Sequence, residues 1–92
     1  MKTFNYFADP GHAWIKCSKD LLKNLGIADQ ISTWSYMRGN YAYLEEDRDA
    51  TVLCNALIRS GIDFKFREYF GNRRSRIRKY KTYKTDLTIS EN

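Results

Sequence analysis

The sequence is poor in the residues on which enzymes and secreted scaffolds usually depend. It has two cysteines, one histidine and one proline among 92 residues. Two cysteines are too few for the disulfide framework of a small secreted domain, so we expect Cys17 and Cys54 to be reduced and buried. The first residues contain no apolar run typical of a secretory signal, and no stretch approaches the ~20 apolar residues of a membrane span. We therefore expect a cytoplasmic protein.

Catalytic motifs are also missing. The sequence has no phosphate-binding loop, no dinucleotide-binding glycine pattern, no paired-cysteine motif and no nucleophile elbow. His12 is the only histidine and lies close to Asp9, but no second ligand or nucleophile accompanies them. We expect a protein that is not an enzyme and that holds neither a cofactor nor a metal. The rival interpretation is a small nuclease or transferase that uses His12 and Asp9.

Positive charge is plentiful but unevenly distributed. Residues 65–84, here called the basic segment, contain nine basic residues and one acid, a net charge of +8, whereas the rest of the chain carries −3 and the whole chain +5. Such a cluster indicates contact with a polyanion, most often a nucleic acid, although an acidic protein would also fit. The simpler alternative is an edge strand whose cations prevent aggregation. The cations of the basic segment are Lys65, Arg67, Arg73, Arg74, Arg76, Arg78, Lys79, Lys81 and Lys84.

Hydrophobic periodicity predicts an α+β fold with the element order β-β-α-β-β-α-β. We expect an antiparallel sheet of about five strands with two helices packed on it, in a single domain over residues 1–84 that is followed by a flexible tail at 85–92. The first helix has Ser18 as its N-cap, and the second has Glu46 or Asp47. Whether residues 73–84 form a last strand or an arm stays open. The predicted strands are 3–7, 12–17, 31–37, 41–44 and 62–67, and the predicted helices are 18–25 and 45–60.

Aromatic residues make up 15% of the chain. On a two-layer sheet such residues belong mostly to the core, and in the strand at 62–67 alternation points Ile62, Phe64 and Phe66 inward. If Tyr41 and Tyr43 instead face outward, they form a platform on which the bases of a single strand can stack. The other aromatic residues considered for such a platform are Trp14, Trp34 and Tyr36.

Four acids cluster at the start of the second predicted helix: Glu45, Glu46, Asp47 and Asp49. Acids in a first helical turn complement the helix dipole, which explains one or two of them well. The other interpretation is a small negative patch that docks onto a basic groove of a partner protein. Their spacing does not match a calcium-binding loop, and no histidine accompanies them.

Three segments together resemble small phage-encoded proteins, and in particular the type I-F anti-CRISPR proteins: FADPGHAWIKC, SYMRGNYAYLEEDRDA and RSRIRKY. The resemblance extends over nearly the whole chain. It implies a protein that binds the crRNA-guided type I-F surveillance complex in the cytoplasm of a host bacterium and blocks target-DNA hybridisation by occupancy. A stand-alone phage protein that binds RNA or DNA and regulates its target is the alternative. The oligomeric state is left open, with a monomer favoured.

We further hypothesise that the two charged regions of the chain make different contacts with such a complex. The acidic patch of Glu45, Glu46, Asp47 and Asp49 would face cationic residues of a Cas protein. The basic segment would face the guide RNA, with a tyrosine stacking on a base. The residues expected at the RNA are Arg73, Arg74, Arg76, Arg78, Lys79, Lys81, Tyr80 and Tyr83.

Overall fold

The computed structural model describes residues 1–85, which form an α+β domain with a six-stranded sheet. Its elements are β1 (Lys2–Ala8), β2 (Ala13–Ser18), α1 (Lys19–Asn24), the 3-10 turn η1 (Ala28–Gln30), β3 (Tyr36–Arg38), β4 (Tyr41–Glu45), α2 (Asp49–Arg59), β5 (Phe64–Phe70), the 3-10 turn η2 (Arg76–Lys79) and β6 (Lys81–Thr82). The predicted fold class is confirmed. Apart from Thr85, the predicted tail lies outside the described residues.

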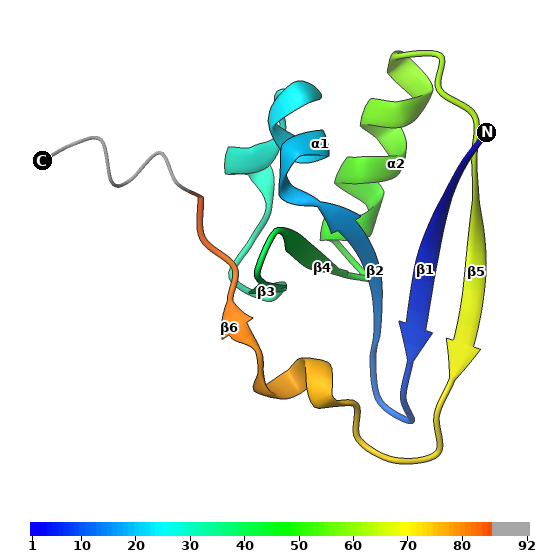
Figure 1. The fold of residues 1–92 in the computed structure, drawn as a ribbon, viewed down its shortest axis with the longest axis vertical. Coiled ribbons are helices and arrows are strands. Elements are labelled where there is room, and N and C mark those ends of the chain that lie inside the picture. The colour runs from blue at the N-terminus through cyan, green and yellow to red at the C-terminus, as the bar shows by residue number, and fades with distance from the viewer. Residues whose placement is uncertain (86–92) are drawn as a thin grey trace, which may run out of the picture.

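The strands are arranged in the order β5-β1-β2-β4-β3-β6, and every neighbouring pair is antiparallel except β5 and β1. Figure 1 shows β1 and β5 side by side and running in the same direction. The prediction of a purely antiparallel sheet is therefore wrong at this pair. The reason is the connection through α2, because a strand that follows a crossover helix can return parallel to its neighbour.

One face of the sheet is covered by the two helices. Alternate strand residues such as Ile15, Cys17 and Leu44 point toward α1 and α2 and are at most 3% exposed. Leu22 of α1 and Leu53 of α2 close this core, and both side chains are fully buried. We call this side of the sheet the covered face and the opposite side the open face.

Ser18 caps α1 as predicted, since its hydroxyl accepts a hydrogen bond from the Leu21 N–H at 3.0 Å. The second helix differs from the prediction, because α2 begins only at Asp49 and its N-cap, Arg48, makes no side-chain cap bond. The strand predicted at 31–37 is reduced to β3, which begins at Tyr36. Its first half is instead a loop that Asp49 holds, as described below.

The C-terminal part of the described chain resolves the open question about residues 73–84. These residues form neither an arm nor a partner of β5: η2 crosses the open face, and β6 pairs with β3 at the far edge of the sheet. Phe66 lies on the covered side, as the predicted alternation requires, but its side chain is 36% exposed because β5 is the edge strand at the other end of the sheet. Both differences arise from long-range contacts that alternation along the sequence does not report.

Candidate nucleic-acid interface

A buried ion pair ties the basic segment to the first hairpin. The Asp9 side chain is 1% exposed and accepts two hydrogen bonds from the Arg78 guanidinium, at 2.7 Å from Nε and 2.8 Å from Nη2. Its oxygens also accept the backbone N–H groups of Ser75, Gly11 and His12, at 2.8, 3.0 and 2.9 Å. These bonds, with that of Arg78 the strongest, hold the pKa of the Asp9 carboxyl far below its usual range. The pair fixes η2 at the end of β1.

An apolar contact anchors η2 from its other side. Ile77 is 4% exposed and packs on Trp14 and Tyr43 of the open face. The Arg78 guanidinium lies 5.7 Å from the Trp14 ring, within the range of a cation–π contact. Ser75 caps the turn, its hydroxyl accepting the Ile77 N–H at 3.2 Å. A segment with many cations is thus held against the sheet by one isoleucine and one arginine.

A groove of about 450 Å³ lies beside η2 on the open face. Three cations border it, and the guanidinium of one of them, Arg38, lies 5.3 Å from the Tyr80 ring. The Tyr80 ring in turn lies 5.0 Å from that of Tyr43, whose pKa is raised chiefly by burial. Cations beside aromatic rings are the combination with which proteins hold single-stranded nucleic acid. The groove is lined by Lys16, Arg38 and Arg76, by Phe7, Tyr43 and Tyr80, and by Ser75 and Ile77.

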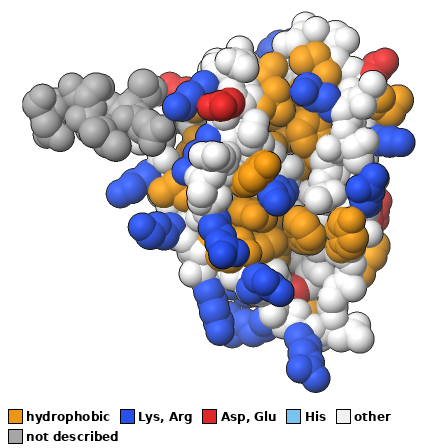
Figure 2. Space-filling model, viewed as in Figure 1, with side chains coloured by type: hydrophobic (Ala, Val, Ile, Leu, Met, Phe, Trp, Pro, Cys, Tyr) orange, Lys and Arg blue, Asp and Glu red, His pale blue; other side chains and the backbone are white. Residues whose placement is uncertain are grey.

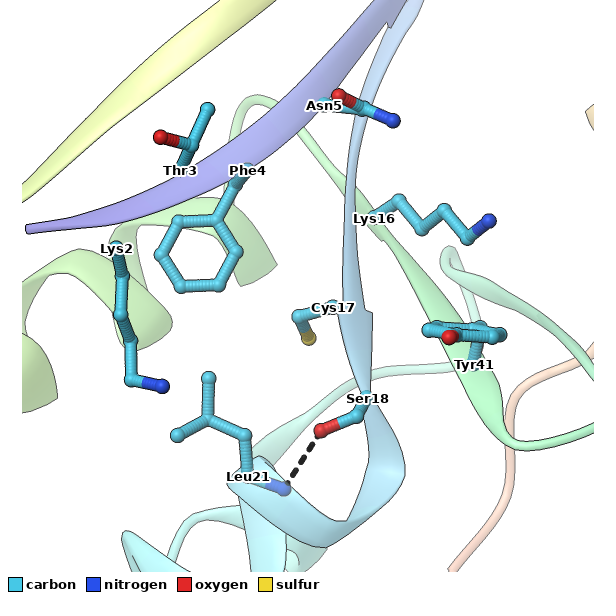
Figure 3. Close-up of a pocket in the computed structure, with 9 residues that line it drawn as sticks. All are labelled: Lys2, Thr3, Phe4, Asn5, Lys16, Cys17, Ser18, Leu21 and Tyr41. Carbon is cyan, nitrogen blue, oxygen red and sulfur yellow. Dashed lines mark hydrogen bonds between the residues drawn. The ribbon is translucent and has the colours of Figure 1, made fainter.

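Lys16 connects this groove to a second hollow of about 300 Å³ where β1 and β2 diverge. The two strands pair from Asn5 and Lys16 to Ala8 and Ala13, and beyond Lys16 they separate. Figure 3 shows Lys16 beside the Tyr41 ring on one side of β2, and the lysine Nζ lies 4.2 Å from the ring centroid. Tyr41 is 45% exposed, so one open-face ring is accessible next to the cation. The two hollows meet at Lys16 and are together called the track, although the second hollow is also lined by Phe4, Cys17 and Leu21 of the covered side.

The cations predicted from the sequence lie around this track to different degrees. Arg76 borders the groove itself, while Arg73, Arg74, Lys79 and Lys81 are exposed beside or after η2. Figure 2 shows lysine and arginine side chains gathered at the end of the molecule where η2 lies, next to hydrophobic side chains. The basic segment is therefore a true surface feature of the folded chain.

Two of the predicted contact residues are not available to a ligand in the expected way. Arg78 is paired with Asp9, so its role is to hold η2. Tyr83 is 4% exposed and donates its hydroxyl to the Ala28 carbonyl at 2.6 Å, which leaves no free ring face for stacking. Tyr80 is half-buried, and its ring lines the groove. Lys65 and Arg67 lie on β5, which forms the edge of the sheet opposite to β6.

The predicted acidic patch loses one of its four members, because Asp49 is buried while Glu45, Glu46 and Asp47 lie at the surface. Asp49 is fully buried and accepts hydrogen bonds from the Ser32 N–H, the Ser32 hydroxyl and the Ser35 hydroxyl. Glu45 accepts the Asp47 N–H, and Glu46 accepts the Tyr6 hydroxyl, whose pKa is raised to about 12 mainly by burial. Asp49 is thus an internal brace between α2 and the loop before β3. The expected four-residue contact with a cationic protein is wrong for this residue.

Three groove residues, Phe7, Lys16 and Arg38, were not predicted from the sequence, and Tyr43 was predicted only as part of a stacking platform with Tyr41. Lys16 and Trp14 alternate with Ala13, Ile15 and Cys17, so the strand pattern alone places Lys16 opposite the core. The signal for the others is weaker, because their meeting depends on the order β1-β2-β4-β3. These groove residues are far apart in the sequence and meet only in the folded sheet, so the sequence alone does not predict the groove.

Asp9 and His12, the residues considered for catalysis, are not joined by a hydrogen bond between their side chains. Both Asp9 oxygens accept hydrogen bonds from Arg78, and the hydrogen bond to His12 involves its backbone N–H.

Burial raises the pKa of the Cys17 thiol to about 12. Among residues 1–85, no three histidine, cysteine or acidic side chains are grouped as a metal site requires. Neither helix in that range has the length and apolar composition of a membrane span.

Comparison of the chain with protein-family models, with curated proteins and with solved structures found no match.

Proposed function

We propose that this protein binds single-stranded nucleic acid along the track formed by the groove and the adjoining hollow, without catalysis. The supporting observation is the convergence of Lys16, Arg38 and Arg76 around the rings of Tyr43 and Tyr80. These cations come from three separate parts of the chain and meet beside rings held in place by the sheet. Cations of this kind contact phosphates, and an accessible ring such as Tyr41 offers a stacking surface.

The more specific form of the proposal rests on the resemblance to the type I-F anti-CRISPR proteins. In this form the bound strand is the guide RNA of the type I-F surveillance complex in the host cytoplasm, and occupancy of the guide prevents capture of target DNA. The alternative is a phage regulator that binds free RNA or DNA. The net charge of +5 favours contact with nucleic acid over mimicry of DNA.

The first test measures binding of the full chain to a fluorescent single-stranded RNA at several salt concentrations. Three phosphate contacts give a slope of about −2 in a plot of log affinity against log salt, since each contributes about −0.7 on a single strand. The double variant Arg38→Glu/Arg76→Glu is expected to abolish most of the binding. Arg78 is left unchanged, because a glutamate there would lie against the buried Asp9 carboxylate.

The matched control for the single reversal Arg76→Glu is Arg59→Glu, which changes the net charge by the same amount on an exposed residue in the last turn of α2. It should reduce binding far less than a groove variant, because α2 lies on the covered face. Equal losses for both variants would mean that net charge alone drives the interaction, and would contradict a specific track.

A second assay separates the two forms of the proposal. The protein is mixed with a purified type I-F surveillance complex before labelled target DNA is added, and DNA capture is measured by gel shift. Loss of capture with wild-type protein, and its recovery with Arg38→Glu/Arg76→Glu, supports the inhibitor. Unchanged capture together with tight binding of free RNA supports the regulator.

A further inference from the structure

One polar side chain on the open face has no partner within residues 1–85. Asn5 is half-buried on β1, and its amide makes no hydrogen bond in that range. Alternation along β1 directs this amide to the side of the sheet opposite the buried Phe4. An asparagine amide carries a donor group beside an acceptor oxygen. Both are therefore available to a ligand that reaches the open face.

The surroundings of Asn5 are a cation and an aromatic ring. Lys16 lies directly opposite Asn5 on β2, and its Nζ is 4.2 Å from the centroid of the Tyr41 ring on β4. Figure 3 shows these three side chains on the same side of the strands, with Lys16 between the amide and the ring. All three line the second hollow of about 300 Å³, which opens where β1 and β2 separate. Three neighbouring strands thus bring an amide, an ammonium group and a ring to one space.

A nucleobase has the chemistry that these groups match. Its faces are flat and stack on aromatic rings, and its edges carry hydrogen-bond donors beside acceptors. Tyr41 is 45% exposed and supplies the ring, while the Asn5 amide supplies a complementary donor and acceptor. The Lys16 ammonium supplies a cation for the adjoining phosphate. A phosphate alone would use the cation but neither the ring nor the amide acceptor.

We propose that Asn5 reads one base of the bound strand, and that this base is adenine. The assignment rests on the proposed function, because it concerns the strand bound along the track. An asparagine amide pairs with an amino group next to a ring nitrogen, which is how it recognises adenine at N6 and N7. Adenine presents this combination on two edges, N6 with N7 and N6 with N1, so either edge matches the amide. The track then binds RNA through a base as well as through phosphates.

A series of single-base changes in the RNA tests this assignment. The full-length chain is titrated into a short fluorescent oligouridine whose central position is adenine, guanine, cytosine or uracil. We expect the adenine strand to bind about tenfold more tightly than the other three. Asn5→Ala should bring the four affinities together. It should leave the salt dependence of binding unchanged, because no cation is lost.

The sharpest variant is Asn5→Asp, which keeps the shape of the side chain but presents only acceptors. Guanine offers two adjacent donors, N1–H and the N2 amino group, to such a carboxylate. We therefore expect guanine to replace adenine as the preferred base, by about tenfold, while the added negative charge lowers the affinity for every strand. The matched control is Asn55→Asp on an exposed residue of α2, which adds the same charge and should keep adenine preferred.

Three outcomes would overturn the assignment: equal affinities of the wild-type chain for all four strands, an adenine preference that persists in Asn5→Ala, or a loss in Asn5→Asp that is equal for adenine and guanine. In each case RNA is still bound with the expected salt dependence, so the proposed track stands. Absence of RNA binding by the wild-type chain would instead refute the proposed function and the assignment together. Circular dichroism spectra that match the wild type exclude misfolding of the variants as the cause.

Discussion

The covered face of the sheet is filled with aliphatic side chains, whereas the open face carries rings and cations. On the covered face Leu22, Leu44, Leu53 and Leu57 are fully buried between the strands and the helices. On the open face, within residues 1–85, η2 lies over the strands and is held there by Ile77, by the neighbouring Tyr80 and by one ion pair. The comparison teaches that the contacts that stabilise the fold differ from the contacts that position the cations. Burial of apolar area between the strands and helices holds the fold together, whereas Ile77 and the ion pair between Asp9 and Arg78 hold the cations of η2 in place.

The largest effect is expected from a change on the covered face. Leu53→Ala removes a fully buried side chain from the middle of α2 and leaves a cavity, which costs about 4 kcal/mol of unfolding free energy. Chemical denaturation followed by circular dichroism measures this loss. Ile58→Ala is the control on the same helix, since Ile58 is 66% exposed. Similar losses for the two variants would show that the helix does not pack as described.

A smaller loss of stability, with a larger loss of binding, is expected on the open face. Asp9→Asn removes the charge that pairs with Arg78, and the new amide group opposes the guanidinium donors. We expect Tm to fall by about 5–10 °C and RNA affinity to fall as η2 loses its position. Calorimetry and RNA titration of one sample measure both. Retention of full RNA affinity would mean that the ion pair does not position the groove.

The same carboxylate predicts a pH dependence. Because the pKa of Asp9 is lower in the folded chain than in the unfolded one, its contribution to stability is present above about pH 4 and is lost as the pH falls below it. Wild-type stability should therefore decline more steeply between pH 5 and pH 2 than that of Asp9→Asn. Parallel declines would assign the acid sensitivity to other carboxylates.

The two faces also differ in how well the sequence predicts them. The covered face follows from local signals: the strand predicted at 12–17 corresponds to β2, Ser18 caps α1, and α2 lies within the helix predicted at 45–60. The open face depends on contacts between residues far apart, such as Asp9 with Arg78, which are 69 positions apart. Neither residue type nor spacing identifies such a pair in one sequence.

Predictions from local sequence patterns are incomplete or wrong where polar contacts between distant residues determine the structure. Asp49 fits the rule for acids at a helix start, yet its carboxylate binds Ser32 and Ser35 of a distant loop. The resulting loop shortens the predicted strand to Tyr36–Arg38. The basic segment was identified from composition alone, but composition could not separate Arg76, which lines the groove, from Arg78, which holds η2. That difference requires the fold.

The smallest expected effect tests how tightly the ion pair is held. A Cβ at Gly11 would lie 3.0 Å from Arg78 Nη2, closer than such atoms normally approach. Gly11→Ala should therefore destabilise the wild-type chain slightly, despite the smaller unfolded-state entropy of alanine. In an Arg78→Gln background the shorter side chain removes the contact, and the same change should stabilise by about 0.4–1 kcal/mol. Denaturation of the four chains measures this reversal of sign. A stabilising effect in both backgrounds would show that the guanidinium can move away, and that the contact between Asp9 and Arg78 is looser than its two short hydrogen bonds indicate.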